Sequence, residues 1–488
     1  MMPLNTLVPE LLLEEGDSSP IVITGITDDS RTVQQGDLFI AVSGTHYSAQ
    51  QMLDDIKVSG AAAVLCDTAE SLESDDIPLY KIENLSMRRG EVASRFYGEP
   101  SRAMHVVAVT GTNGKTSCSQ FIAKALNVRC GVIGTLGHGF LPELQTTGLT
   151  TPSAVSMQQM LANLLDHGAE AVCLEASSHG LDQGRLNGTA IKTAVFTNIT
   201  RDHLDYHETF EAYKAAKQTL FFWPGLETAV LNMDDSFAAD LRTGLSPEVG
   251  CLTYSLEQTS ADIYCAWMKF ELTGIRASVI TPWGEMEIST SLIGDFNLSN
   301  LLAVICVLGS AGISAEDMPG RIASISNVVG RMDQLPLAKG AVAIIDYAHT
   351  PNALENALRA ARFHCSGKLW CVMGCGGDRD VGKRPIMGEI TSRLADISVV
   401  TDDNPRTEAS DEIIENILAG ALQGADVRVE SDRRKAIAMA LAGSDAGDLI
   451  LIAGKGHETY QEIDGERFDF SDYAEVERYE SAYAGRSL

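Results

Sequence analysis

The chain has 488 residues, of which 45% are hydrophobic, and its 66 acidic and 37 basic residues give a formal net charge of −29. It contains no run of about 18 apolar residues, so we expect no membrane insertion. A balance this acidic argues against nucleic-acid binding, which needs a basic surface. At roughly 100–200 residues per domain, the length predicts three domains.

The cysteines and the N-terminus indicate the class of protein. Ten cysteines lie between Cys66 and Cys375, without paired CxxC motifs. This spacing argues against a zinc site and a disulfide scaffold, and it favours reduced thiols in a cytoplasmic protein. Met1–Glu15 lacks a basic leader and is interpreted as folded chain, not as a signal peptide. We expect the protein to act as a monomer.

The first predicted domain covers residues 1–100. Three short apolar segments predict strands joined by turn-rich loops: Ile21–Ile26, Asp37–Val42 and Ala61–Cys66. Glycine and proline at Gly98–Ser101 mark its end. We therefore expect a small α/β domain.

The second predicted domain covers residues 101–329. It begins with the strand His105–Thr110, followed by a glycine-rich turn and a helix from Lys115. The apolar segments Ala171–Leu174 and Ala194–Thr197 predict further buried strands of a mainly parallel sheet. The later segments are expected to be antiparallel strands at Ala277–Pro282 and Met286–Ser291, and an apolar helix at Asn297–Ser310.

The third predicted domain covers residues 330–488, where strands and helices alternate. This pattern predicts a Rossmann-like doubly wound sheet. Its expected strands are Ala341–Asp346, Lys368–Met373, Ile397–Thr401, Val427–Val429 and Asp448–Ala453.

A glycine-rich loop between a strand and a helix is the strongest local signal. It comprises the candidate phosphate-binding residues Gly111, Thr112, Asn113, Gly114, Lys115 and Thr116. Glycines let backbone N–H groups surround phosphates, and the helix N-terminus adds positive potential. Lys115 would neutralise the phosphates and Thr116 would bind Mg²⁺. Val109 occupies the first glycine position of the usual pattern, so the loop is a shorter variant.

Two further segments offer metal ligands. Glu175 ends a predicted parallel strand near the phosphate loop, which suits a second Mg²⁺ contact. His203 and His207 lie in a dense polar stretch after the next strand, without the HExxH pattern of zinc hydrolases. A solvated loop remains the alternative interpretation of this stretch.

Several isolated residues have more than one interpretation. From its helix alone, Lys217 is expected to be a surface lysine. Asn297 and Asn300 could cap the helix that follows them or contact a nucleotide base. Arg331 and Asp346 belong to the third domain, and Asp346 again follows a strand.

Ten segments in one order, covering nearly the whole chain, resemble the Mur ligase family of ATP-dependent amino-acid-adding enzymes. They are TGTNGKT (110–116), EASSHGLDQGRL (175–186), TNITRDHLDYH (197–207), YKAAK (213–217), GDFNLSN (294–300), GRMD (330–333), DYAHTP (346–351), GCGGDRDVGKRP (374–385), DDNPRTE (402–408) and GKGHETYQ (454–461). The early segment 29–48 resembles the uridine-nucleotide-binding domain of family members that add diaminopimelate.

The resemblance implies a role for each domain: the first binds the UDP end of the substrate, the second binds ATP and the third binds the amino acid. Ser30 and the turn at Gly44–Tyr47 would lie near the UDP end, although the turn differs from the expected one. The muramoyl-dipeptide would contact Thr150, Thr151, Ser177, Gln183 and Arg185. ATP would also contact Asn300, Arg331 and Asp346.

The resemblance also implies a metal site and three catalytic residues. Thr116, Glu175, His203 and Lys217 would position Mg²⁺, with Lys217 carbamylated and so converted into a carboxylate-like ligand. Lys115, Lys217 and His203 would be catalytic. ATP and Mg²⁺ are thus the expected cofactors.

The amino-acid selector implied by the resemblance is the motif Asp403, Asn404, Pro405 and Arg406. Lysine-adding members of the family usually lack the arginine of this motif. Diaminopimelate differs from lysine by one extra carboxylate, and a planar guanidinium can bind a carboxylate through two parallel hydrogen bonds. Arg379 would pair with the other carboxylate. Glu458, with Gly454 nearby, would hold an ammonium group.

The expected reaction joins the D-glutamate side-chain carboxylate of UDP-N-acetylmuramoyl-L-alanyl-D-glutamate to meso-2,6-diaminopimelate through an acyl phosphate. This step belongs to peptidoglycan precursor synthesis. Three alternatives remain: a lysine-adding member of the family, a sister ligase that makes folylpolyglutamate or cyanophycin, and a nucleotide-gated binding protein without catalysis. Arg406 argues against the first, and the retained Lys115, Glu175, His203 and Lys217 argue against the last.

Overall fold

The computed structural model describes residues 1–11, 21–42, 53, 56–68, 74 and 76–484. The chain divides into two compact units, one of residues 1–262 and 303–313, the other of residues 263–302 and 314–488. The structure is mixed α/β with largely parallel sheets, as the sequence predicts. The division into three domains stays a prediction. Among the described residues, no helix has the length and apolar character needed to cross a bilayer.

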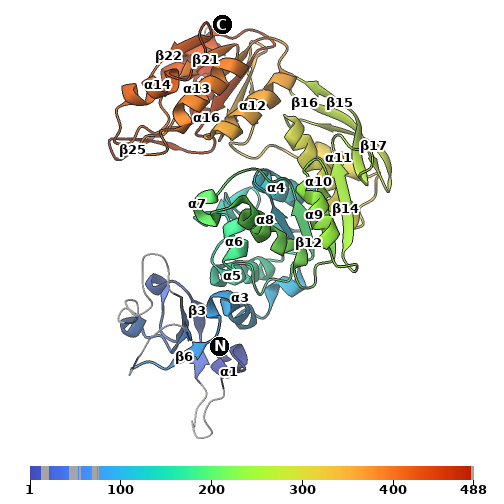
Figure 1. Cartoon of the computed structure of the whole chain (residues 1–488), viewed down its shortest axis with the longest axis vertical. Coiled ribbons are helices and arrows are strands. Elements are labelled where there is room, and N and C mark those ends of the chain that lie inside the picture. The colour runs from blue at the N-terminus through green and yellow to red at the C-terminus, as the bar shows by residue number, and fades with distance from the viewer. Residues whose placement is uncertain (12–20, 43–52, 54–55, 69–73, 75, 485–488) are drawn as a thin grey trace. The chain divides into compact units, whose positions relative to one another are not determined.

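The N-terminal part of the first unit contains a four-stranded parallel sheet (Figure 1). Its strands are β3 (Gly25–Thr27), β4 (Asp37–Ala41), β5 (Ala63–Asp67) and β6 (Leu79–Ile82). Apolar residues on one face pack against α1 (Leu4–Leu7) and α3 (Leu85–Phe96). The short 3-10 helices are η1 (Ser30–Thr32) and η2 (Pro100–Ala103).

One predicted strand of this region was wrong. Ile21–Ile26 is divided into β2 (Val22–Ile23) and β3, which belong to different sheets. β2 pairs antiparallel with β1 (Met2–Pro3), whereas β3 pairs parallel with β4. The apolar pattern is the same in both halves, so only the pairing partners separate them.

The central part of the first unit is a sheet in the order β10, β9, β8, β11, β7, β12, β13, β14. The five strands β8, β11, β7, β12 and β13 pair in parallel with one another, and β14 pairs in parallel with β13. The strands are β7 (His105–Thr110), β8 (Cys130–Gly134), β9 (Gly137–Phe140), β10 (Glu143–Gln145), β11 (Ala171–Glu175), β12 (Thr193–Phe196), β13 (Thr228–Asn232) and β14 (Gly250–Ser255).

Helices cover both faces of this sheet because its central strands are apolar on both sides. One face packs against α5 (Ala154–Asp166), α6 (Ser178–Asp182), α8 (Phe210–Gln218) and α9 (Phe237–Gly244). On the other face, Cys118 of α4 (Lys115–Ala125) lies near Cys173 of β11. The short helix α7 (Leu204–His207) precedes α8, and η3 (Thr219–Phe222) follows it.

The second unit begins with antiparallel strands β15 (Ile263–Glu271), β16 (Gly274–Thr281) and β17 (Gly284–Thr290). The antiparallel pairing predicted for β16 and β17 is confirmed. The helices that follow are α10 (Asp295–Ser310), whose residues 303–310 belong to the first unit, and α11 (Met318–Ala323). Because α10 begins at Asp295, neither Asn297 nor Asn300 is its N-cap, and that interpretation was wrong.

The C-terminal sheet has the order β18, β19, β23, β20, β21, β22, and only β18 is antiparallel to its neighbour. The strands are β18 (Asp333–Pro336), β19 (Val342–Asp346), β20 (Leu369–Met373), β21 (Ile397–Val400), β22 (Asp426–Val429) and β23 (Leu449–Ala453). Parallel register aligns the carboxyl ends of β19, β20, β21 and β23 at one edge, where open α/β sheets bind ligands.

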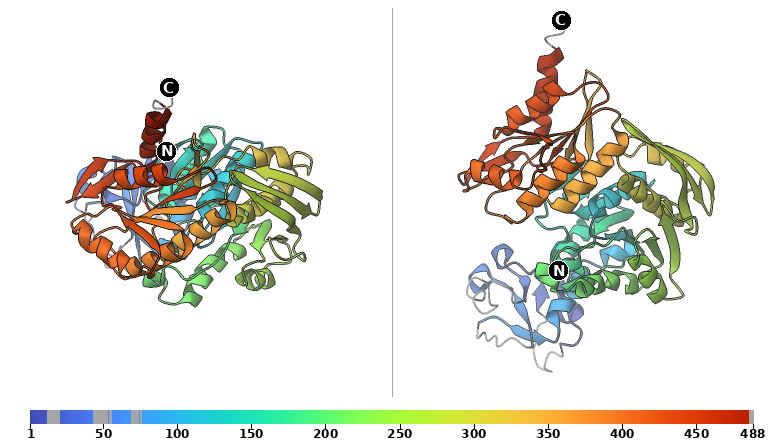
Figure 2. Two further views of the ribbon diagram at one scale, coloured as in Figure 1. Left: turned by 90° about the horizontal axis from the view of Figure 1, so that it is seen from above. Right: turned by 45° about the horizontal axis from the view of Figure 1, so that its top comes forward.

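Helices cover both faces of the C-terminal sheet (Figure 2). One face packs against α12 (Pro351–His364), α13 (Lys383–Leu394) and α14 (Ser410–Leu418). The other packs against α15 (Arg433–Gly443) and α16 (Asp472–Ala484). A hairpin of β24 (Tyr460–Ile463) and β25 (Glu466–Asp469) follows β23. The predicted Rossmann-like doubly wound arrangement is therefore confirmed.

Candidate active site

The glycine-rich loop lies between β7 and α4, as predicted. Gly111 and Gly114 have φ angles of 155° and 85°, which favour glycine. A Cβ on Gly111 would lie 1.9 Å from Oγ1 of Thr197, so the loop passes directly against the end of β12. Thr197 Oγ1 also donates to the Asn113 carbonyl at 2.6 Å. The strand ends thus hold the loop in the shape that a phosphate cradle needs.

Two lysines point at the carbonyl of Gly111. Lys115 Nζ donates to it at 2.9 Å and Lys217 Nζ at 2.8 Å. Lys217 is 1% exposed, so the alternative of a surface lysine was wrong. Burial lowers the pKa of Lys217 well below its ordinary value of 10.5, and the charge of Lys115 lowers it further, against an opposing effect of Asp202. A lysine with a lowered pKa holds a larger fraction of neutral, nucleophilic amine.

Glu175 ends β11 beside the loop and is 2% exposed. Its carboxylate accepts from Thr116 Oγ1 at 2.9 Å, from Thr135 N at 2.8 Å and from Thr135 Oγ1 at 3.1 Å. A Cβ on Gly134 would lie 2.1 Å from Glu175 Oε1, so glycine leaves the carboxylate its room. The predicted neighbours Thr116 and Glu175 are therefore brought together.

His203 lies among aromatic rings beside this loop. Its ring centroid is 4.9 Å from that of His179 and 6.0 Å from that of Tyr213. Tyr213 in turn shares a 2.9 Å hydrogen bond with Thr112 of the loop. The side chain of His203 is 45% exposed and lies 3.6 Å from Asp202. The hydrogen bonds and ion pairs described for the chain do not join His203 directly to Glu175 or Thr116.

The residues predicted to hold Mg²⁺ supply suitable donors. Mg²⁺ prefers oxygen ligands, and the hydroxyl of Thr116 and the carboxylate of Glu175 already lie together. A carbamate on Lys217 would add oxygens at the Gly111 end. Among the described residues, no group of three or more His, Cys, Asp and Glu side chains could hold a metal ion.

The residues predicted for the muramoyl-dipeptide form one hydrogen-bonded group. Thr151 Oγ1 shares a 2.9 Å bond with Ser177 Oγ, and Arg185 Nη1 donates to the Thr151 carbonyl at 2.8 Å. Arg185 Nε donates to Gln183 Oε1 at 3.0 Å. Thr150 Oγ1 lies 3.0 Å from Oγ1 of Thr135, which joins this group to Glu175.

The predicted UDP contacts are only partly described. Ser30 begins η1, and the turn at 44–47 lies outside the described residues. The link from this segment to the central residues runs through Asp28, which accepts from Ser153 Oγ at 3.0 Å and lies 3.8 Å from Arg89. Arg89 and Asp28 were not predicted from the sequence.

In the second unit, Arg331 and Asp346 lie close together. Asp346 accepts from the Met332 backbone at 2.7 Å, and the Arg331 guanidinium lies 5.1 Å from the centre of the Tyr347 ring. Burial raises the pKa of Asp346 to about 6, although the charge of Arg331 lowers it. Nε of Arg331 is buried and makes no hydrogen bond within the described chain. Asn300, also buried, donates to Asn297 at 3.4 Å.

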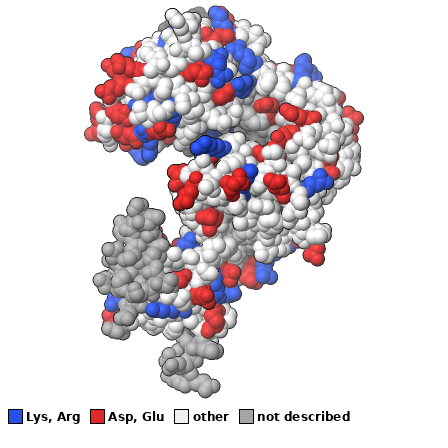
Figure 3. Space-filling model, viewed as in Figure 1, with Lys and Arg blue, Asp and Glu red and all other residues white. Residues whose placement is uncertain are grey.

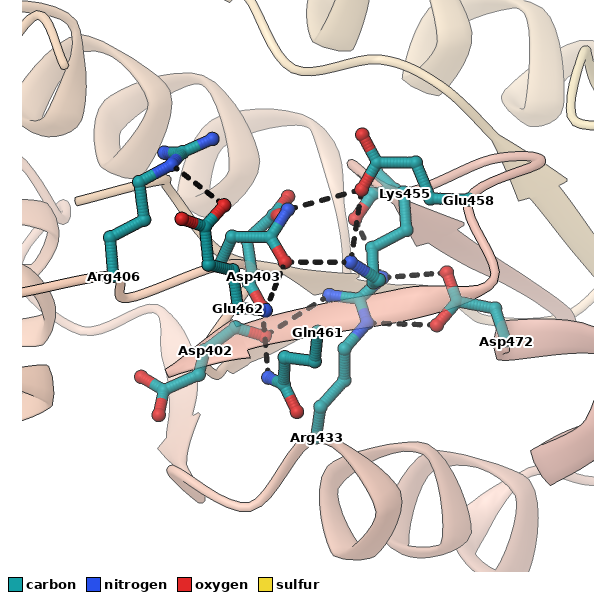
Figure 4. A network of polar contacts seen from close by, with 11 residues as sticks. Asp402, Asp403, Arg406, Arg433, Lys455, Glu458, Gln461, Glu462 and Asp472 are labelled. Carbon is teal, nitrogen blue, oxygen red and sulfur yellow. Dashed lines mark hydrogen bonds and ion pairs between the residues drawn. The ribbon is translucent and has the colours of Figure 1, made fainter. Parts of the chain in front are cut away.

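Four residues predicted for the amino acid lie in the segments that follow β21 and β23, and Figure 4 labels Asp403 and Glu458 among them. Asp403 Oδ2 lies 2.5 Å from the position of a Cβ on Gly454, and Asn404 Nδ2 donates to Glu458 Oε2 at 3.0 Å. Lys455, which was not predicted, donates to both Asn404 and Glu458 at 3.0 Å. The glycine at 454, with φ of 120°, allows this close approach.

Arg406 and Arg379 flank Gly376. A Cβ there would lie 2.9 Å from Arg406 Nη1 and 3.7 Å from Arg379 Cγ. Arg406 has a φ of 53°, donates to the Gly377 carbonyl at 2.7 Å and lies 3.5 Å from Glu462. The carbonyl of Pro405 lies 1.9 Å from the position of a Cβ on Gly377. Arg379 is exposed, so two guanidinium groups stand at this edge.

Three structural partners of these residues were not predicted from the sequence. Thr135 lies 40 positions before Glu175, and the local sequence does not distinguish Lys455 from a surface lysine. Arg433 forms two 2.8 Å bonds to Asp472, and both side chains are fully buried. The spacing within GKGHETYQ could have drawn attention to Lys455, since it lies between the predicted Gly454 and Glu458.

The comparisons with known proteins agree with this geometry. Residues 109–308 match the model of the Mur ligase middle domain, and residues 330–456 match that of the Mur ligase, glutamate ligase domain. The chain is 46% identical to a UDP-N-acetylmuramoyl-L-alanyl-D-glutamate–2,6-diaminopimelate ligase of Pseudomonas aeruginosa, over 99% of both chains. It is 47% identical to the protein of that name from Pseudomonas syringae pv. tomato, over 94% of this chain and 95% of the other.

Solved structures show the same architecture. A structure of a UDP-N-acetylmuramoyl-L-alanyl-D-glutamate–2,6-diaminopimelate ligase matches 99% of both chains, with 36% identity and a TM-score of 0.78. MurF ligase from Thermotoga maritima, in complex with ADP, matches 89% of this chain and 94% of its own, with 20% identity and a TM-score of 0.61. The second likeness supports the fold alone.

Proposed function

The chain belongs to the Mur ligase family, and on that premise we propose that it joins meso-2,6-diaminopimelate to UDP-N-acetylmuramoyl-L-alanyl-D-glutamate with consumption of ATP. The observation that carries the proposal is the convergence of Lys115 and Lys217 on Gly111, with Thr116 and Glu175 in contact at the start of α4. This arrangement suits a triphosphate. The likeness to diaminopimelate ligases over the whole chain gives the substrates.

The phosphate loop would hold ATP for attack by the side-chain carboxylate of D-glutamate. A carboxylate oxygen bonds to the γ-phosphorus, ADP leaves, and an acyl phosphate forms. Lys115 would offset the charge of the phosphate oxygens, so this step rests on positioning and electrostatics. Mg²⁺, held by Thr116, Glu175, His203 and carbamylated Lys217, would neutralise further negative charge.

The second half of the reaction makes the amide. The neutral amine of diaminopimelate attacks the activated carbonyl, giving a tetrahedral intermediate that expels phosphate, and the nitrogen loses a proton. The dipeptide would be held by Thr151, Ser177, Gln183 and Arg185. Hydrogen bonds join these residues to one another in the structure. Asn300, Arg331 and Asp346 would complete the ATP site.

Selection of diaminopimelate is assigned to the edge formed by Arg406 and Arg379. Each guanidinium would pair with one carboxylate of the amino acid, and Glu458, with the Gly454 backbone nearby, would hold an ammonium group. The chain carries a net charge of −29, and Figure 3 shows acidic and basic side chains interspersed on the face it draws. The binding of anionic substrates therefore depends on nearby arginines and lysines, because the net charge of the whole chain would repel them.

The proposal extends to the setting of the enzyme. All ten cysteines are free thiols, and eight of them are buried, which suits a reducing compartment. We place the protein in the cytoplasm as a monomer that supplies peptidoglycan precursors for cell-wall growth and division.

The experiment is a reconstitution with UDP-muramoyl-dipeptide, ATP, Mg²⁺ and meso-diaminopimelate, followed by mass spectrometry. The expected product has the mass of the two substrates joined with loss of water, and it appears only when all components are present. ADP should form in equal amount. ATP hydrolysis without this product, or no turnover at all, contradicts the proposal.

A further inference from the structure

A fully buried lysine lies under the amino-acid site, immediately after β23. The side chain of Lys455 is 0% exposed, and its ammonium donates at 3.0 Å to Asn404 Oδ1 and at 3.0 Å to Glu458 Oε2 (Figure 4). Burying an ammonium is costly unless it is paired and hydrogen-bonded. Both acceptors are residues assigned to the substrate, so Lys455 is joined to the site by the contacts that make its burial tolerable.

These contacts fix the orientation of Asn404. Its Oδ1 accepts from Lys455 Nζ and from the Glu462 backbone N–H at 2.9 Å, while its Nδ2 donates to Glu458 Oε2. An amide has an acceptor end and a donor end, so two donors at one end decide which way it points. Without the ammonium, Oδ1 would keep only the Glu462 donor.

Glu458 is held by one of its two oxygens. Lys455 and Asn404 both reach Oε2, and the other oxygen points away from them (Figure 4). The carboxylate side chain is 19% exposed. One oxygen is therefore anchored by two donors, and the other is not held by them.

The nearby charges show why a cation is needed at this place. Asp403 is 7% exposed and lies behind the same loop, where burial raises its pKa and the charges of Arg433 and Lys455 oppose the effect. Arg433 gives two of its bonds to Asp472. The ion pair described for Glu458 is the one with Lys455, at 3.0 Å.

The same framework reaches the other end of the selector. Arg406 N donates to the Glu462 carbonyl at 3.0 Å, and the Glu462 N–H donates to Asn404. The residue that would bind the distal carboxylate and the one that would bind the ammonium are thus connected through one residue of β24.

We propose that Lys455 is a positioning and specificity-determining residue for the amino-acid substrate. It holds Asn404 and Glu458 in the arrangement that receives an ammonium group of diaminopimelate, and it does so without touching the substrate. The inference rests on the proposed function, because the amino-acid site is part of that proposal.

The test compares Lys455→Met with wild-type enzyme in steady-state kinetics. A charged hydrogen-bond partner is worth enough that KM for diaminopimelate should rise on the order of tenfold to a hundredfold. KM for ATP and for the UDP-linked substrate should stay within about twofold. The control is Lys435→Met. Lys435 lies on α15, which covers the C-terminal sheet, and its side chain is 69% exposed, so this variant should change none of these constants.

A double variant separates action through Glu458 from general damage. Because Lys455 acts through this carboxylate, Lys455→Met combined with Glu458→Gln should raise KM for diaminopimelate no more than the larger single effect. Multiplying effects, an unchanged KM for diaminopimelate, or an equal rise in all three KM values would overturn the inference. If Lys455→Met is insoluble, Lys455→Gln is measured against the same criteria.

The wild-type enzyme distinguishes this failure from failure of the proposed function. Normal turnover by wild type with an unaffected Lys455 variant overturns the role of Lys455 alone. Lack of turnover by wild type with diaminopimelate overturns the proposed function itself.

Discussion

Lys115 and Lys217 donate to the same backbone oxygen, that of Gly111, at 2.9 and 2.8 Å. Two ammonium groups this close disfavour each other, and burial of Lys217 adds to the effect. Lys217 is therefore the one inclined to lose its proton. A neutral amine can attack carbon dioxide, which yields a carbamate and releases one proton, so the arrangement favours the modification that we assign to this lysine.

The first prediction is that Lys217 carries a carbamate. Enzyme equilibrated with ¹³C-bicarbonate should show a carbamate carbon signal by NMR, and Lys217→Met should lack it. Turnover of that variant should fall on the order of a hundredfold or more, because an anionic ligand for the Mg²⁺ that supports phosphoryl transfer is lost.

Lys214 provides the matched control, since it lies on the same helix with its side chain 26% exposed. Lys214→Met should keep both the carbon signal and the activity. A signal that survives Lys217→Met would contradict the assignment.

The second prediction concerns the dependence on Mg²⁺. Glu175→Gln removes the charge next to Thr116 and keeps the shape, so the Mg²⁺ concentration for half-maximal turnover should rise. This concentration should rise at least about tenfold to a hundredfold, because removing even an outer partner of a metal site lowers metal affinity by that factor. Glu170→Gln, an exposed residue preceding the same strand, should have no effect. An unchanged Mg²⁺ dependence of Glu175→Gln would remove this carboxylate from the metal site.

The third prediction is a pH dependence of stability set by Asp346. Its pKa of about 6 lies above the ordinary 3.8, so between these values the folded chain keeps a proton that the unfolded chain releases. The free energy of unfolding therefore falls as pH rises from about 4 to about 6 and then levels off. Each pKa unit corresponds to about 1.4 kcal/mol, so the contribution is about 3 kcal/mol.

Denaturant titrations at pH 4.5 and pH 7 check this sign. Asp346→Asn should lose less stability than wild type between the two pH values, while the exposed Asp411→Asn should follow wild type. If wild type and Asp346→Asn lose the same free energy of unfolding between pH 4.5 and pH 7, the Asp346 carboxylate does not titrate in this window.

The fourth prediction concerns the geometry of the selector. Arg406→Lys keeps the positive charge but loses the planar fork, so KM for diaminopimelate should rise on the order of tenfold with little change in KM for ATP. Steady-state kinetics with each substrate varied in turn measures this difference. A variant with wild-type KM would mean that charge alone, or another residue, binds the distal carboxylate.

Local patterns in the sequence were sufficient for the phosphate loop and most strands. The strand His105–Thr110 and the helix from Lys115 have the predicted bounds, because an apolar run followed by glycines and a lysine leaves few other structures. Ile21–Ile26 was harder, since its division depends on which distant strand each half meets.

Burial and long-range contacts explain what local sequence patterns alone could not give in the site. The local sequence does not distinguish Lys217 and Lys455 from surface lysines. Only tertiary packing places each one inside the protein. Thr135 reaches Glu175 because β8 and β11 are neighbouring parallel strands, a pairing that the local sequence does not specify. The selection of diaminopimelate rests on the resemblance and on the position of Arg406.

The most direct test of the account is phosphate release by wild-type enzyme with UDP-muramoyl-dipeptide, ATP and Mg²⁺, run in parallel with meso-diaminopimelate and with L-lysine. The account predicts strong turnover with diaminopimelate and little with lysine, and loss of the diaminopimelate reaction in Arg406→Ala. Equal or faster turnover with lysine would contradict it.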